Sequence, residues 1–205
     1  MIDATGWDDR YRGAAFVWTT EPNRFLAPEV SGLRSGRALD LACGEGRNAV
    51  WLATQGWEVT GIDFSRVGLD KAVQLGAAND VTCEWLRGDV TRWRAEQPYN
   101  LVIVFYLQLP RAERTSAFAG AACALAPGAT LLIVGHDLTN LTDGFGGPQN
   151  PDVLYTPDDV RDDLVTAGVA DLVIERAERV KRPVTTDAGP RVAIDTLVRA
   201  HRPTR

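Results

Sequence analysis

The stretch Gly36-Arg-Ala-Leu-Asp-Leu-Ala-Cys-Gly-Glu-Gly-Arg-Asn-Ala-Val-Trp-Leu52 decides the fold of this chain. It opens with a short apolar run, residues 38–42, which a single acid, Asp40, interrupts. The run ends at Gly44-Glu-Gly46, and apolar residues at helical spacing follow from Ala49. This order predicts a buried strand, a glycine turn and the start of a helix.

Such a turn is suited to holding a ligand. The glycines lack a Cβ, so a ligand can approach the backbone closely. The free N–H groups at the helix start carry a partial positive charge, which favours a carboxylate or a phosphate.

Two more strands are expected to end beside this turn. Residues 57–63 form a second strand that ends in Asp63, about 20 residues after the glycines, where nucleotide-binding units place the acid that takes ribose hydroxyls. A third strand, residues 81–87, is followed by Gly88-Asp-Val90. Since ligands bind outside the carboxyl ends of parallel strands, we expect one site at this edge of the sheet.

Two cofactors fit the pattern Gly44-x-Gly46-x-x-Ala49, because it also matches a dinucleotide fingerprint. Against a dinucleotide, Asp40 inside the first strand would repel a pyrophosphate. The same acid suits the ammonium group of an amino-acid-like ligand.

Three motifs in order carry a resemblance to a known family: Leu39-Asp-Leu-Ala-Cys-Gly-Glu-Gly46, Gly61-Ile-Asp-Phe-Ser65 and Arg87-Gly-Asp-Val90. Over residues 36–136 the chain resembles the class I S-adenosylmethionine-dependent methyltransferases. The resemblance implies an α/β fold: a Rossmann-like, seven-stranded, mostly parallel sheet with helices on both faces and an antiparallel edge hairpin. It also implies S-adenosyl-L-methionine as cofactor and S-adenosyl-L-homocysteine as product.

The resemblance further implies which residues contact the cofactor. In the family, the acid after the second strand binds the ribose, and the residues after the third strand meet the adenine amino group and ring. Carried onto this chain, the candidate cofactor residues are Tyr11, Trp18, Asp40, Ala42, Gly44, Gly46, Arg47, Asp63, Phe64, Gly88, Asp89, Val90 and Phe105.

The leader of the chain resembles a particular group within the family. Trp7-Asp-x-Arg-Tyr11, Trp18 and Pro22-Asn-x-Phe-Leu26 are similar to the front end of small-molecule methyltransferases of the thiopurine and tellurite-resistance type. There this segment closes over the cofactor. The alternative is an N-terminal helix that only packs on the sheet, with Trp7 and Tyr11 on one face.

Composition narrows the class of protein. The chain has 205 residues, of which 45% are hydrophobic and 24% charged, with a formal net charge of −5. These values are typical of a soluble globular protein and argue against nucleic acid as the substrate. Three scattered cysteines and two histidines do not form a zinc pattern, so we expect no metal. The first ten residues lack signal-peptide features and no apolar run is long enough to span a membrane, so we expect a cytoplasmic enzyme.

We expect a single domain over residues 1–205, with a helical lid segment (1–35), a cofactor-binding core (36–136) and an acceptor loop with a C-terminal hairpin (137–205). Short helices are expected before the first strand. The remaining expected elements are a helix over 65–78, a strand over 99–106, a helix over 111–125 that stops at Ala126-Pro-Gly128, a strand over 129–135, a helix from Thr156 to near Gly168, and hairpin strands over 172–180 and 191–200.

The candidate catalytic residues are His136, Asp137 and Tyr106, which follow the fifth and fourth strands. His136 can take a proton from an acceptor hydroxyl, with Asp137 or another nearby acid holding its tautomer. Tyr106 and Gln108 are expected to orient the acceptor. Alternatively, His136 only hydrogen-bonds the following loop.

The loop over residues 139–155 is rich in turn formers and is expected to shape the acceptor pocket, with Phe145 and Tyr155 as apolar contacts. A divalent ion on His136, Asp137 and Asp143 is a weaker alternative.

The hypothesis is methyl transfer to a small molecule, with a hydroxyl favoured by His136. The residues after the fourth strand are Phe105-Tyr-Leu-Gln-Leu-Pro110 and lack the Pro-Pro-Tyr loop of amino-directed DNA methyltransferases. A thiol or chalcogen acceptor would need no base. The rival classes are a nicotinamide-dependent oxidoreductase and a non-catalytic cofactor-binding module. The oligomeric state is not indicated by the sequence.

Overall fold

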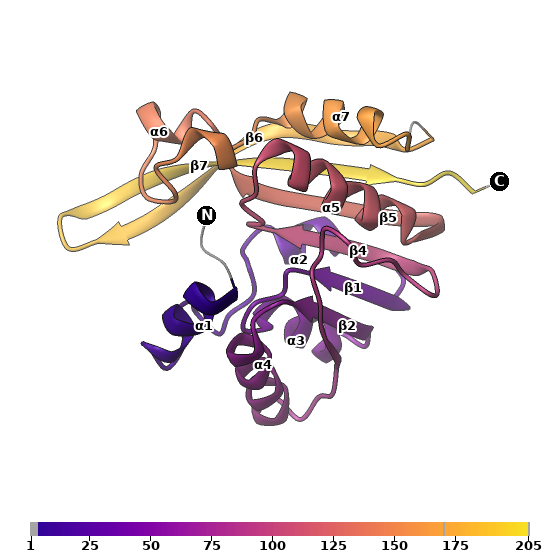
Figure 1. Cartoon of the computed structure of the whole chain (residues 1–205), viewed down its shortest axis with the longest axis horizontal. Helices are drawn as coiled ribbons and strands as arrows, with labels where there is room; N and C mark the ends of the chain where they lie inside the picture. Colours follow the sequence, from indigo (N-terminus) through magenta and orange to yellow (C-terminus); the bar gives the residue numbers. More distant parts are fainter. Residues whose placement is uncertain (1–3, 170, 205) are drawn as a thin grey trace.

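A computed structural model describes residues 4–169 and 171–204, and within them seven strands form one sheet in the order β3-β2-β1-β4-β5-β7-β6 (Figure 1). The strands are β1 (Arg37–Leu41), β2 (Glu58–Asp63), β3 (Glu84–Arg87), β4 (Tyr99–Phe105), β5 (Leu125–His136), β6 (Val173–Thr186) and β7 (Gly189–His201). The helices are α1 (Ala4–Arg12), α2 (Leu26–Val30), α3 (Arg47–Thr54), α4 (Arg66–Ala78), α5 (Arg111–Cys123), α6 (Asn140–Asp143) and α7 (Pro157–Thr166), with a 3-10 turn η1 (Pro151–Val153).

The strand pairing confirms the predicted fold class. Strands β1 to β5 pair in parallel, and β7 pairs antiparallel with both β5 and β6. The sheet is therefore Rossmann-like and mostly parallel, with an antiparallel hairpin at one edge. The division into a lid, a core and an acceptor segment stays a prediction, and its residues 1–3, 170 and 205 lie outside the described ones.

The sheet is buried on both faces, because alternate residues of each strand point to opposite sides. Leu39 and Leu41 of β1 belong to the core on one face, which includes Phe118 of α5. Ala38 belongs to the core on the other face, which includes Leu52 of α3. Figure 1 shows α5 and α7 on one side of the sheet and α3 and α4 on the other.

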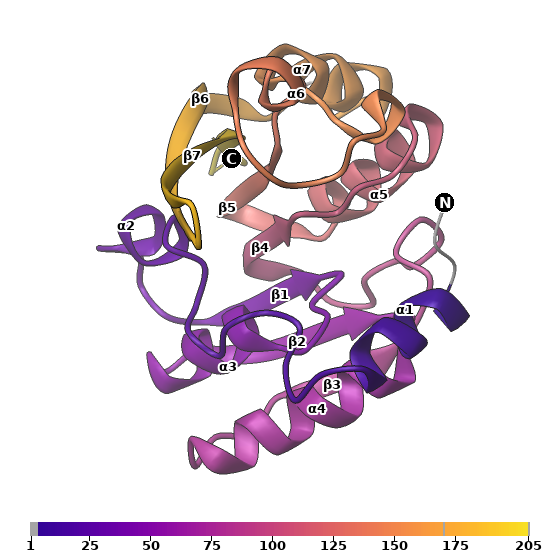
Figure 2. The same cartoon turned by 90° about the vertical axis from the view of Figure 1, so that its left-hand side faces the viewer.

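The carboxyl ends of β1, β2 and β4 lie at one edge, which Figure 2 shows facing the viewer. On the α4 side of this edge lies α1, which packs against α4. On the opposite side lie α6 and the β6–β7 hairpin, with the ends of β1 and β4 between the two groups. The residues predicted to bind a ligand therefore meet at one edge of the sheet.

Three element boundaries differ from those expected. The strand expected over 81–87 begins only at Glu84, because residues 81–83 lie outside the register with β2. The helix expected to reach residue 125 ends at Cys123, and the Pro-Gly sequence after it lies within β5. Pairing of β4 with β5 is irregular there, and Gly128 takes a left-handed backbone, with its N–H donating to the Arg202 carbonyl at 2.7 Å.

The hairpin is longer than expected. Its strands pair from Val173 and His201 out to Thr186 and Gly189, beyond the edge of the rest of the sheet (Figure 1). The outer half, Lys181 to Arg191, is polar on both sides, so its sequence lacks the alternation that marks a half-buried strand. None of the described helices is long and apolar enough to cross a membrane.

Candidate functional site

The glycine turn between β1 and α3 has a backbone conformation that is unfavourable for residues with a Cβ. Ala42, Gly44 and Gly46 all have positive φ angles, at 62°, 55° and 79°. A Cβ on Gly46 would lie 2.6 Å from the Cβ of Ala72 and 2.8 Å from the ring of Trp85. The turn thus needs glycine at this position both for its backbone angle and for its packing.

Asp40 lies beneath this turn and is almost fully buried, at 1% exposure. Its Oδ2 atom has no hydrogen-bond partner among the described residues. Burial, together with the charge of Asp63, raises the pKa of Asp40 to about 7. A buried, unpaired carboxylate oxygen is costly, so this atom marks a place for a cationic or hydrogen-donating ligand group.

Asp63 supports the turn from the end of β2. Its carboxylate accepts the N–H of Gly44 at 2.8 Å and the N–H of Ser65 at 2.9 Å. Burial raises its pKa to about 6. Since a carboxylate has about four acceptor positions and the Phe64 N–H also approaches this one, capacity for a ligand hydroxyl remains.

Glu45, in the middle of the turn, fastens the leader to the site. Its carboxylate accepts the N–H of Val17 at 3.0 Å, the N–H of Trp18 at 3.2 Å and the ammonium of Lys71 at 3.0 Å. Lys71 also donates to the carbonyl of Ala14 at 2.7 Å. The Glu45–Lys71 ion pair therefore links the glycine turn to α4, and both side chains hold the leader through hydrogen bonds with its backbone.

Tyr11 of α1 is brought to the glycine turn. Its side chain is 4% exposed, and a Cβ on Gly44 would lie 2.8 Å from its hydroxyl. Its ring lies 5.4 Å from that of Trp7, as their spacing on one helix face predicts. Burial raises the pKa of Tyr11. Trp18, in contrast, is 42% exposed and stacks with Arg10, so in this structure its ring lies at the surface.

The other candidate cofactor residues line the ends of β2, β3 and β4. Asp89 is exposed and accepts the N–H of Thr91 at 2.9 Å, and the Thr91 side chain lowers its pKa. The N–H of Gly88 donates to the Asp63 carbonyl at 3.0 Å, which joins two strand ends. Phe64 is half-buried, whereas Val90 and Phe105 are buried.

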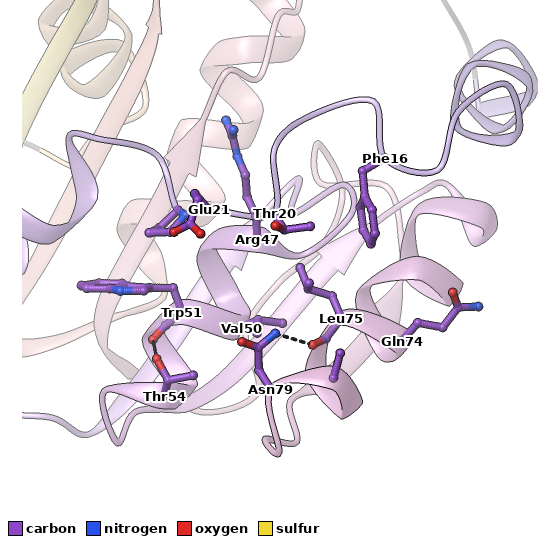
Figure 3. A pocket seen from close by; sticks show the side chains of 12 residues that line it. Phe16, Thr20, Glu21, Arg47, Val50, Trp51, Thr54, Gln74, Leu75 and Asn79 are labelled. Atoms are coloured by element: carbon purple, nitrogen blue, oxygen red, sulfur yellow. Dashed lines mark hydrogen bonds between the residues drawn. The ribbon is translucent and has the colours of Figure 1, made fainter.

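Arg47, the first residue of α3, has a guanidinium that donates to Thr19 of the leader at 3.3 Å. Burial lowers its pKa, against the charges of Tyr106 and Asp40. Arg47 is among the residues that line a hollow, and in Figure 3 its side chain points away from that hollow.

That hollow, of about 500 Å³, is a separate feature between the leader, α3 and α4. Phe16 and Trp51 face it from two sides (Figure 3). It reaches Thr54 and Ala78, the last residues of α3 and α4. Because α3 starts at the ligand edge, the hollow extends away from that edge and is not the cofactor site.

At the end of β5, the acid beside His136 is Asp195 of β7. The Nδ1 atom of His136 lies 3.2 Å from Oδ1 of Asp195. The rings of Tyr106 and His136 are 4.8 Å apart, and the Tyr106 hydroxyl donates to Asp195 Oδ2 at 2.8 Å. Burial raises the pKa of Tyr106. Tyr106 itself has a left-handed φ of 56°, a strained backbone that is typical of functional sites.

Asp137 has a different set of partners from the one expected. Its Oδ1 accepts from the N–H of Thr139 at 2.8 Å and from Arg179 at 2.9 Å, and its Oδ2 accepts from Thr196 at 2.8 Å. It is fully buried and holds the start of the acceptor loop against the hairpin.

Two expected acceptor contacts are structural. Tyr155 is fully buried and packs edge-on against Phe118 at 5.8 Å, so it is a core residue and the prediction that it lines the pocket is wrong. The Gln108 amide, in the orientation that satisfies both its ends, donates to the Val153 carbonyl at 2.7 Å and accepts the N–H of His136 at 3.3 Å, so it holds the loop.

The loop over 139–155 contains α6 and η1. Phe145 is exposed and shares a shallow hollow with Arg191 and Val192 of the hairpin. No group of three or more metal-ligating side chains is found among residues 4–169 and 171–204.

No sequence pattern indicates a role in the site for four residues that the structure places there: Asp195, Arg182, Glu45 and Lys71. The hairpin residues follow no motif and lie about 50 residues after His136. Only their register, with His136 opposite Asp195, brings them to the site. Glu45 lies within a recognised motif, but its contacts with the leader leave no pattern in the sequence.

A family model and several known proteins are similar to this chain. A family model described as a methyltransferase domain matches residues 38–128. The trans-aconitate 2-methyltransferase of Klebsiella pneumoniae (strain 342) is 35% identical over 86 residues, which are 40% of this chain and 32% of that protein. The chain matches about a third or less of the length of its curated relatives.

Solved structures resemble almost the whole chain. The structure of TehB from Haemophilus influenzae has a TM-score of 0.73 at 15% identity and covers 97% of this chain and 66% of that one. The glycopeptide N-methyltransferase MtfA in complex with S-adenosylmethionine has a TM-score of 0.63 at 21% identity, over 88% of this chain and 92% of that one. At these identities the likeness shows the fold, which agrees with the class predicted from the sequence.

The link between Glu45 and the leader predicts the effect of Glu45→Gln. An amide is a weaker acceptor and has no charge for Lys71, so the leader should detach more often. We expect faster tryptic cleavage at Arg10, Arg12 and Arg24, by about tenfold or more, which corresponds to the loss of a charged hydrogen bond. Glu21→Gln, an exposed change in the same leader, is the control. Equal cleavage rates in the two variants would contradict the role of Glu45.

The raised pKa of Asp40 predicts that cofactor binding depends on pH. With its pKa raised to about 7, the carboxyl is mostly neutral at pH 6 and mostly charged at pH 8. Because an ammonium group prefers the charged form, the affinity for S-adenosyl-L-homocysteine should rise about tenfold from pH 6 to pH 8. Isothermal titration calorimetry measures this. Asp40→Asn should bind more weakly and lose most of the rise; a parallel slope in the variant would exclude Asp40 as the ammonium partner.

Proposed function

Because the chain carries a methyltransferase domain of the class I, S-adenosylmethionine-dependent type, we propose that it transfers the cofactor's methyl group to a hydroxyl group of a small molecule. The observation that carries the choice of a hydroxyl is the half-buried imidazole of His136, which lies beside a carboxylate at the ligand edge. An imidazole can take a hydroxyl proton as a general base.

The residues of the glycine turn fit S-adenosyl-L-methionine. The unpaired Oδ2 of Asp40 suits the ammonium group, and the guanidinium of Arg47 suits the carboxylate. Asp63 retains acceptor positions for the ribose hydroxyls, and the exposed Asp89 can accept from the adenine amine. When bound, the cofactor supplies an electrophilic methyl group on its sulfonium centre.

The chain's own contribution is orientation and proton removal. Methyl transfer requires in-line attack, so most of the rate comes from holding the acceptor oxygen in place. His136 removes the proton from that oxygen as the new bond forms. Tyr106 holds the acceptor through its phenolic oxygen, while the leader, fastened by Glu45, excludes water.

A small molecule is favoured over a nucleic acid by the formal net charge of −5, since phosphate backbones require a basic surface. The trans-aconitate methyltransferase named above acts on a small organic acid by its name, which supports this class. The cysteines among the described residues are all free, which supports a reducing, cytoplasmic location.

Other functions would use the residues of the site differently. A thiol or chalcogen acceptor, already an anion, would not need His136. A nicotinamide-dependent oxidoreductase would place a pyrophosphate beside the buried Asp40, which opposes it. A non-catalytic module would need none of the polar groups at the end of β5.

The central test is His136→Ala, assayed with methyl-labelled S-adenosyl-L-methionine against a panel of phenols, hydroxy acids and thiols. Turnover of hydroxyl acceptors should fall by about 10²- to 10⁴-fold, the usual contribution of a general base. Binding of S-adenosyl-L-homocysteine should be unchanged.

His201→Ala is the matched control, because His201 lies at the far end of β7, paired with Glu175 at 2.9 Å. Full turnover by His136→Ala would exclude the base. Turnover confined to thiols, in both the wild type and the variant, would favour the chalcogen alternative.

A further inference from the structure

Asp195 is a buried acid at the ligand edge that contacts Tyr106, Arg182 and His136. It lies on β7 directly opposite His136 of β5 in the antiparallel register. Its side chain is fully buried. The hydrogen bonds from Arg182 and Tyr106 and the nearby imidazole of His136 outweigh its burial and lower its pKa, so it is ionised at neutral pH.

The two oxygens of Asp195 have different partners. Oδ2 accepts from Arg182 Nε at 2.6 Å and from the Tyr106 hydroxyl at 2.8 Å. Oδ1 has only a long contact of 3.4 Å from Arg182 Nη2 and the His136 Nδ1 atom at 3.2 Å. Oδ1 is therefore the oxygen with capacity left for the imidazole.

His136 has no other use for its Nδ1 atom. Nδ1 is buried and has no well-aligned hydrogen-bond partner among the described residues. The ring packs against that of Tyr106, with centroids 4.8 Å apart, and Gly147 lies so close beside it that an added Cβ would come within 3.0 Å of Nδ1. A proton on Nδ1 therefore faces Oδ1 of Asp195, whereas a lone pair on Nδ1 would face a negative charge.

We propose that Asp195 is a positioning residue, which holds His136 as the tautomer protonated on Nδ1 and so leaves the lone pair on Nε2 to take the acceptor's proton. This inference rests on the proposed role of His136 as base. A carboxylate that binds one imidazole nitrogen decides which nitrogen is basic. In the step itself, the proton passes from the acceptor oxygen to Nε2 while the methyl–sulfur bond breaks, and Asp195 stabilises the imidazolium that results.

The same carboxylate also sets the role of Tyr106. Since the phenolic proton is given to Oδ2, the phenol cannot also donate to a ligand. Tyr106 can therefore only accept a hydrogen bond from the acceptor, at a phenolic oxygen that the side chains of Asn23 and Arg182 also approach. Arg182, stacked 5.6 Å from the Tyr106 ring, keeps Asp195 charged and in place.

The test is the tautomer of His136, read from its ring ¹⁵N chemical shifts at a pH where the imidazole is neutral. The chain has only two histidines, so His201→Gln assigns the signals. We expect Nδ1 to be protonated in the otherwise unchanged protein. Asp195→Asn should shift the population toward the Nε2-protonated form and lower kcat by about tenfold or more, with the KM for the cofactor unchanged.

Asp137→Asn is the matched control: it neutralises a neighbouring buried acid whose hydrogen-bond partners are Thr139, Arg179 and Thr196, and it should leave the tautomer unchanged. If Asp195→Asn fails to fold, the tautomer of the His201→Gln protein still decides. An Nε2-protonated His136 there, or an unchanged tautomer and kcat in folded Asp195→Asn, would overturn the inference. An Nδ1-protonated His136 together with full turnover by His136→Ala would instead overturn the base and keep the hydrogen bond.

Discussion

The hydrogen bond from the Gly44 N–H to the Asp63 carboxylate joins the two halves of the proposed cofactor site. It ties the left-handed turn after β1 to the end of β2, and Asp40 lies buried beneath that turn. Glu45, from the same turn, binds the leader. One short segment thus fixes the strand ends, the start of α3 and the cover over the site. This is why so few residues decide so much of the fold.

The acceptor side is organised by a different acid and from a distant part of the chain. Asp195 comes from the hairpin that closes the sheet, and it connects Tyr106, Arg182 and His136. The antiparallel pairing of β5 with β7 therefore serves the site as well as the sheet. In a fold whose cofactor half is shared by many proteins, such edge elements are where specificity for an acceptor can be built.

The elements around the glycine turn are predictable from the sequence, because their signals are local. Strand, glycine turn and helix follow one another within residues 36–52, and Ser65 caps α4 as expected, by accepting the N–H of Gly68 at 3.0 Å. The acceptor half was harder to predict because its contacts are distant in sequence. Asp195 lies in a strand whose outer part has no apolar alternation. The position of Tyr155 in a loop predicts a pocket residue, whereas its ring packs in the core. Residue type and position along the chain do not determine which of two neighbouring acids, Asp137 or Asp195, faces His136.

A thermal-shift titration tests whether the chain binds an S-adenosyl cofactor or a dinucleotide. A ligand that binds only the folded chain stabilises it by RT ln(1 + [L]/Kd), so the melting temperature rises with ligand concentration. S-adenosyl-L-homocysteine should raise the melting temperature with increasing concentration, while NAD and NADP in parallel samples leave it unchanged. A shift with a dinucleotide and none with S-adenosyl-L-homocysteine would contradict the account, and the roles given to Asp40, Asp63 and Arg47 would be wrong with it.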